Sequence, residues 1–146
     1  MNFRVTNLAA AAVLALAGAA HAAEFEVRML DKGAKGEDVF EPDLLRIAPG
    51  DRVHFVLTDK SHNVQTIKGM IPEGAEPFEG MINEELTITF TVTGVYGIKC
   101  KPHYAMGMVG LIVVGDPVNR EAAQAVKDPL QSRKAKKVFD ELFGEL

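Results

Sequence analysis

The sequence contains very little of several residue types. It has one cysteine, no tryptophan and two tyrosines in 146 residues. A single thiol excludes an internal disulfide and the C-x-x-C-H motif of haem attachment, and it argues against a structural zinc site built on several cysteines. The formal net charge is −4, which does not suggest a nucleic-acid-binding protein. Either the single thiol, Cys100, is buried and inert, or another group occupies its sulfur.

Long hydrophobic runs are absent after the N-terminal segment. Residues 1–22 carry the basic Arg4, an Ala-rich apolar stretch too short to span a bilayer securely, and the small-x-small ending Ala20-His21-Ala22. These features predict a secretory signal peptide that is cleaved before Ala23, the alternative being a membrane anchor retained in the mature protein. We expect an exported mature chain with no membrane span and three histidines.

The segment that follows alternates apolar and polar residues with the period of two that half-buried strands show. Residues 68–83, with two prolines and three glycines, predict a loop that contains at most one helical turn. Turn residues separate the predicted strands, which are 24–30, 39–47, 52–59, 62–67, 85–92, 95–99 and 108–115. The number and spacing of the strands predict an all-β Greek-key sandwich of about eight strands over residues 23–117.

The C-terminal residues 118–146 have a different character. They are rich in helix formers, and Val138, Phe139 and Leu142 stand at helical spacing. We predict two helices that are interrupted near Asp128-Pro129. A basic cluster in this extension is interpreted as a solvated helix face rather than a docking patch, and consists of Arg133, Lys134, Lys136 and Lys137.

The single cysteine lies where the predicted strand 95–99 ends. Alternation along this strand places Cys100 on the same face as Tyr96 and Ile98, so the thiol is expected to point into the sandwich. His103 and Met108 follow in a C-x2-H-x4-M loop. A thiolate, an imidazole and a thioether are soft ligands, and together they favour copper over any hard cation.

A mononuclear copper site of this kind requires a second imidazole. His54 alternates with the apolar residues of its strand and is interpreted as a surface histidine. His62 stands where one predicted strand ends and another begins, and it is the natural distant ligand. A Cys-His hydrolase is a competing interpretation, but it would need an exposed thiolate, an orienting group and an oxyanion loop.

These residues resemble the ligand set of the cupredoxin family of blue copper proteins. Within that family, the stretches HNVQTIKGMIPEGAEPF and KCKPHYAMGMVGLIVVGD look like the pseudoazurin group, as does the helical C-terminal extension, which would pack on the sandwich. The resemblance covers the chain from about Phe25 to its end.

The resemblance implies a type 1 site that holds one copper ion per monomer. Its ligands would be His62, Cys100, His103 and, as the long axial ligand, Met108, with Met106 as the competing axial candidate. Asn63 would hydrogen-bond across to the ligand loop, and a backbone amide would point at the Cys100 sulfur.

The resemblance also implies a function, which is transfer of one electron in the periplasm and not catalysis. His103 would bring one ring edge to the surface while His62 would lie deeper. A docking surface is expected around it, formed by Pro102, Ala105, Met106, Lys32, Lys60, Lys99 and Lys101.

The expected partners of this monomer are periplasmic redox proteins, namely c-type cytochromes and the copper nitrite reductase of denitrifying bacteria. Asp38 and Glu79 are acidic where the family often has apolar or basic residues. The alternative function is copper storage or delivery.

Overall fold

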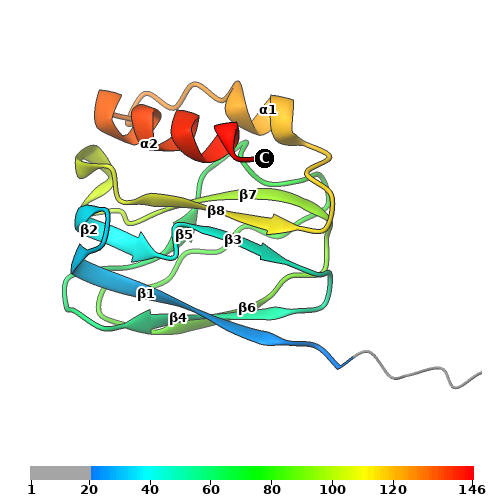
Figure 1. Cartoon of the computed structure of the whole chain (residues 1–146), viewed down its shortest axis with the longest axis horizontal. Helices are drawn as coiled ribbons and strands as arrows, with labels where there is room; N and C mark the ends of the chain where they lie inside the picture. Colours follow the sequence, from blue (N-terminus) through cyan, green and yellow to red (C-terminus); the bar gives the residue numbers. More distant parts are fainter. Residues whose placement is uncertain (1–20) are drawn as a thin grey trace, which may run out of the picture.

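The computed structural model describes residues 21–146, which form two four-stranded sheets packed face to face, with two helices on the outside of one sheet (Figure 1). This confirms the predicted all-β sandwich with two C-terminal helices. Most of the predicted signal peptide, residues 1–20, lies outside the described residues.

The first sheet has the order β2-β1-β4-β6. Its strands are β1 (Glu24–Gly33), β2 (Gly36–Glu41), β4 (Arg52–Leu57) and β6 (Leu86–Thr89). Strand β1 pairs antiparallel with β2 and parallel with β4. Only one face of this sheet is covered, so its strands alternate in the way the sequence predicts: Val27, Met29, Val53 and Phe55 lie in the core between the sheets.

The second sheet has the order β3-β8-β7-β5. Its strands are β3 (Leu44–Ile47), β5 (Gln65–Thr66), β7 (Gly94–Lys99) and β8 (Val109–Val114). Every residue of β8 is buried, because one face of the strand meets the first sheet and the other meets the helices. A strand covered on both faces is apolar throughout its length, which explains the uninterrupted run VGLIVV.

The two helices are α1 (Arg120–Gln124) and α2 (Arg133–Gly144), and they lie over β7 and β8 (Figure 1). Ser132 caps α2 by accepting a hydrogen bond from the amide of Ala135. Phe139, Leu142 and Phe143 point down from α2 and form a second buried cluster with apolar residues of β7 and β8. The basic residues of α2 all lie on its exposed side, as expected for a solvated face.

Several strand boundaries differ from those expected from the sequence. The segment 39–47 is two strands in different sheets, because the chain crosses between them at Pro42, whose nitrogen has no hydrogen for a strand ladder. The strand expected at 62–67 is reduced to β5. The segment 68–83 is a loop, as predicted, with turns and bends and no helical turn.

Within residues 21–146, neither α1 nor α2 is long and apolar enough to cross a membrane.

Candidate metal centre

The thiol of Cys100 lies at the end of β7 and points into the core between the sheets, together with Tyr96 and Ile98. Alternation along β7 therefore predicted its direction correctly. The side chain is 0% exposed, and the thiol is free. A buried thiol at a strand end is held by the sheet but lies next to the loop that follows, which is where the other donors come from.

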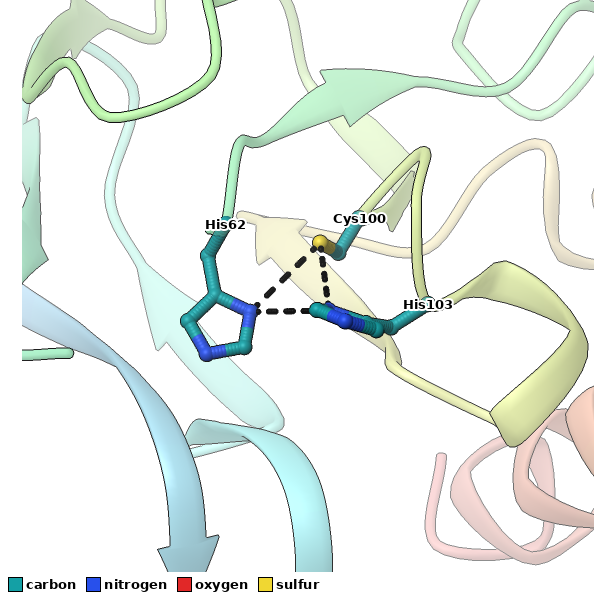
Figure 2. Close-up of side chains that lie close together, drawn as sticks. All are labelled: His62, Cys100 and His103. Atoms are coloured by element: carbon teal, nitrogen blue, oxygen red, sulfur yellow. Dashed lines mark hydrogen bonds between the residues drawn. The ribbon is translucent and has the colours of Figure 1, made fainter. Parts of the chain in front are cut away.

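Two imidazoles point at this sulfur, as Figure 2 shows. The Nδ1 atoms of His62 and His103 lie 3.8 and 3.6 Å from the Cys100 Sγ, and 3.0 Å from each other. A triangle with these three sides has a circumscribed circle of radius about 2.0 Å, close to the usual metal–nitrogen and metal–sulfur bond lengths of about 2.0–2.3 Å. The three donor atoms are therefore spaced to surround one ion.

The ligand loop is closed by hydrogen bonds between its own donor residues. The amide of Cys100 donates to the carbonyl of Met108, and the amides of both His103 and Met108 donate within the loop, to the carbonyls of Cys100 and His103. Met108 is 0% exposed and belongs to the same core cluster as Cys100, whereas Met106 is exposed. The thioether in the buried set is therefore that of Met108.

Asn63 connects the strand end beside His62 to this loop. Its Oδ1 accepts a hydrogen bond of 2.7 Å from the amide of Lys101, and its Nδ2 donates to the carbonyl of Gly80. The residue is 1% exposed, so these bonds form away from water. Asn63 thus fixes the distance between the two segments that supply the histidines.

The metal-free thiol is held in its protonated form. Burial raises the pKa of Cys100, backbone hydrogen bonds from Asn63 and His103 act in the opposite direction, and the charge of Asp38 adds to the rise. A metal cation at the centre of the triangle supplies the positive charge that a buried thiolate needs. The donor set and its spacing thus fit a soft cation such as copper.

Two carboxylates contact the imidazoles, Asp31 at the outer Nε2 of His62 and Asp38 beside the inner Nδ1 of His103. Asp31 accepts a hydrogen bond of 2.9 Å from His62 Nε2, an arrangement that directs Nδ1 at the sulfur. Asp38 lies 3.8 Å from His103 Nδ1, and donor atoms of Asp31, Asp38 and His62 all lie within 4.8 Å of one another. The acidity of Asp38 is evident in the sequence, whereas its contact with the site and that of Asp31 were not predicted.

The register of the β1–β2 hairpin explains this contact. Leu30 pairs with Val39 and Lys32 pairs with Glu37, so Asp31 stands opposite Asp38. Like charges directly across a ladder destabilise a hairpin. The two imidazoles beside them are hydrogen-bonding and electrostatic partners for these carboxylates. The pair of Asp31 and Asp38 could have been predicted by counting back along both strands from the turn at Ala34-Lys35.

The surface over the site is apolar at its centre. The side chain of His103 is 19% exposed, and Pro102, Ala105 and Met106 around it are exposed. Two further exposed apolar side chains, Met81 and Ile82, were not predicted to belong to this surface. They belong to the loop whose Asn83 amide donates to the carbonyl of His62, so they lie at the same end of the sandwich.

The four lysines expected around this surface are not equivalent. Lys32, Lys60 and Lys101 are exposed, and Lys101 lies 3.8 Å from Glu79. Lys99 is only 12% exposed, and its ammonium group lies 3.8 Å from Asp128 and 4.4 Å from the centre of the Tyr104 ring. The rim of the surface is therefore mixed in charge, and Lys99 faces the helical extension.

The remaining histidine of the sandwich lies away from this centre. His54 is on the outer face of β4, where its Nε2 lies 2.8 Å from Glu85 Oε2. It was interpreted as a surface residue, and its position agrees with that.

Two sheets packed as a sandwich, with a thiol and two imidazoles gathered at one end, define the class of copper-binding cupredoxin domains. Residues 17–115 match the family described as copper binding proteins of the plastocyanin/azurin family. The chain is 56% identical to pseudoazurin of Paracoccus pantotrophus, over 86% of this chain and 87% of that protein. It is 50% identical to a putative pseudoazurin of Rhizobium leguminosarum bv. viciae, over 87% of this chain and 84% of that protein.

A solved structure agrees with these similarities. The crystal structure of pseudoazurin from Methylobacterium extorquens AM1 matches with a TM-score of 0.79 and 47% identity, covering 84% of this chain and 98% of that one. The chain belongs to the pseudoazurins, and copper is the cofactor of this family. The resemblance drawn from the two ligand-bearing stretches is therefore confirmed.

Proposed function

We propose that this protein is a periplasmic one-electron carrier that holds a single copper ion through His62, Cys100, His103 and Met108. The observation that carries the proposal is the triangle of donor atoms, whose sides of 3.0, 3.6 and 3.8 Å surround one point at bonding distance. Bound copper supplies a centre that alternates between Cu(II) and Cu(I). The chain transforms no substrate in this role.

The residues around the site have separate tasks. Asp31 orients the ring of His62, and Asn63 and the backbone bonds of the ligand loop keep the donors in place when the charge of the centre changes. A scaffold that holds the donor atoms in the same positions in the oxidised and the reduced states of the centre keeps the movement of these atoms on electron transfer small. Burial of the sulfur and of His62 excludes water from the site.

The partly exposed edge of His103 is the proposed route for the electron. A partner that docks on the apolar surface formed by Pro102, Ala105 and Met106 comes into contact with this ring. We further propose that Lys32, Lys60 and Lys101 contribute to docking on periplasmic redox proteins, with a copper nitrite reductase and c-type cytochromes as the partners to test first. The proposed location depends on residues 1–22 acting as an export signal.

The direct test is a spectrum of the copper-loaded mature chain. One equivalent of copper should give an intense visible thiolate-to-copper band that a mild reductant bleaches, and Cys100→Ser should abolish it. His54→Gln is the matched control, because it changes a histidine of the sandwich without touching the triangle. A colourless oxidised protein that contains copper would contradict the proposal, and slow self-exchange with transfer of Cu(I) to an apo-acceptor would indicate storage or delivery instead.

A further inference from the structure

One carboxylate of the helical extension reaches the residues next to two proposed copper ligands. Asp128 lies in the linker between α1 and α2. Its Oδ2 accepts a hydrogen bond of 2.9 Å from the hydroxyl of Tyr104 and lies 3.8 Å from the ammonium group of Lys99. The same ammonium group lies 4.4 Å from the centre of the Tyr104 ring. The three side chains therefore form a closed set of contacts, which we call the clasp (Lys99, Tyr104 and Asp128).

The clasp is largely buried, and its carboxylate is fully partnered. The second oxygen of Asp128, Oδ1, accepts a hydrogen bond from the amide of Leu130, so both oxygens of the carboxylate have a partner. Tyr104 is 4% exposed, and the side chains of Lys99 and Asp128 are 12% and 15% exposed. Hydrogen bonds and ion pairs are stronger in such surroundings than at the open surface.

The position of the clasp in the chain gives it a connection to the metal centre. Lys99 immediately precedes Cys100, and Tyr104 immediately follows His103. Because neighbouring residues of an extended strand point to opposite faces, the sulfur points into the sandwich while Lys99 points to the helices. Tyr104 likewise packs in the cluster under α2, whereas the ring of His103 meets the sulfur.

We propose that Asp128 is a positioning residue of the copper site, which holds both ends of the segment from Cys100 to His103 and thereby fixes the separation of the sulfur and the imidazole. This role rests on the proposed copper site. It gives the helical extension a task beyond covering the sheet, since the carboxylate comes from residues that follow the sandwich. It also explains why Lys99 is not part of the exposed rim.

The test compares variants of the clasp with a variant that loosens the same extension elsewhere. Asp128→Ala removes every contact of the carboxylate, Asp128→Asn keeps an acceptor but not the charge, and Tyr104→Phe keeps the ring but not the hydroxyl. Asn119→Ala is the control: Asn119 attaches the start of α1 to both backbone groups of Val95, at the opposite end of β7 from Cys100. It weakens the attachment without touching the clasp.

Two measurements distinguish positioning from general stability. In the copper-loaded protein, release of copper to an excess of chelator should be at least tenfold faster in Asp128→Ala than in the unchanged chain, with a displaced visible band. The rate of copper release from Asn119→Ala should stay within twofold of that of the unchanged chain. This should hold even if the thermal midpoint of Asn119→Ala falls by as much as that of Asp128→Ala. In the metal-free protein, alkylation of the Cys100 thiol should accelerate in Asp128→Ala and not in Asn119→Ala.

The conservative variants keep the test decisive if Asp128→Ala does not fold. Release rates and band positions of Asp128→Asn and Tyr104→Phe that match the unchanged chain would overturn the proposal, as would equal effects of the clasp variants and Asn119→Ala. Failure of the copper site itself gives a different result, because the unchanged chain would then take up no copper with a thiolate band. The two failures are therefore distinguishable.

Discussion

Asp38→Asn should raise the reduction potential of the copper-loaded protein. The carboxylate lies 3.8 Å from His103 Nδ1 with 19% of its side chain exposed. The oxidised site carries one more positive charge than the reduced site, so a neighbouring negative charge favours the oxidised form. The amide is nearly the same size as the carboxylate, and asparagine tolerates the φ of +50° that position 38 adopts. The substitution thus removes the charge and leaves the hairpin intact.

The size of the shift follows from the distance. Two unit charges about 4 Å apart interact by about 4 kcal/mol at an effective dielectric constant of about 20. The added charge is shared between the metal and its ligands, and solvent screens the exposed part of the carboxylate, so we retain a quarter to a half of that energy. The result is about 1–2 kcal/mol, which for one electron is a rise of roughly 45–90 mV.

Cyclic voltammetry of the copper-loaded variants measures this shift directly. Asp140→Asn is the matched control, because it removes the same charge from the exposed side of α2, where Asp140 pairs with Lys136. Its potential should equal that of the unchanged chain. A fall in potential for Asp38→Asn, or an equal change in both variants, would refute the electrostatic reasoning.

Three other results are expected. Asn63→Ala should lower the free energy of unfolding of the metal-free protein by about 1–3 kcal/mol, measured with urea, since it leaves the amide of Lys101 without its partner; an unchanged midpoint would exclude this role. Phe139→Ala should cost about 3–5 kcal/mol in the same assay because the ring is buried under the helices, whereas Val118→Ala, at an exposed position, should change it by less than about 0.5 kcal/mol. The metal-free protein should also lose stability as the pH rises above 9.0, the ordinary pKa of a thiol, because burial raises the pKa of Cys100 in the folded state. The stability that this shift contributes is present below pH 9.0 and is lost as the pH rises through the higher folded pKa. Cys100→Ala should remove this part of the pH dependence of the free energy of unfolding.

Local patterns predicted most of the fold. Alternation in β1, β4 and β7 identified the buried faces and the direction of the Cys100 side chain, because which face a strand residue occupies depends only on its position along the strand. The division of 39–47 into two strands was missed, since the choice of sheet depends on distant partners: β3 pairs with β8 and β2 pairs with β1.

In the candidate site, too, local features could be predicted from the sequence and contacts between distant residues could not. The C-x2-H-x4-M loop is local, so its donors could be predicted from spacing. The contacts of Asp38 with His103 and of Asp128 with Lys99 join residues far apart in the chain, and no periodic pattern contains them. Lys99 was for this reason expected on the docking surface, although its charge is engaged beneath the helices.

The partial exposure of a single donor residue limits how the carrier can work. Of the three residues in the triangle, only His103 has any exposed surface, while His62 and Cys100 are 0% exposed. If His103 is the route, an electron donor and an electron acceptor must occupy the same area of the molecule in turn. Turnover would then depend on how quickly each complex dissociates, so tight binding of either partner would slow delivery to the other. A mixed-charge rim, where Lys101 lies close to Glu79, suits such brief and sequential encounters.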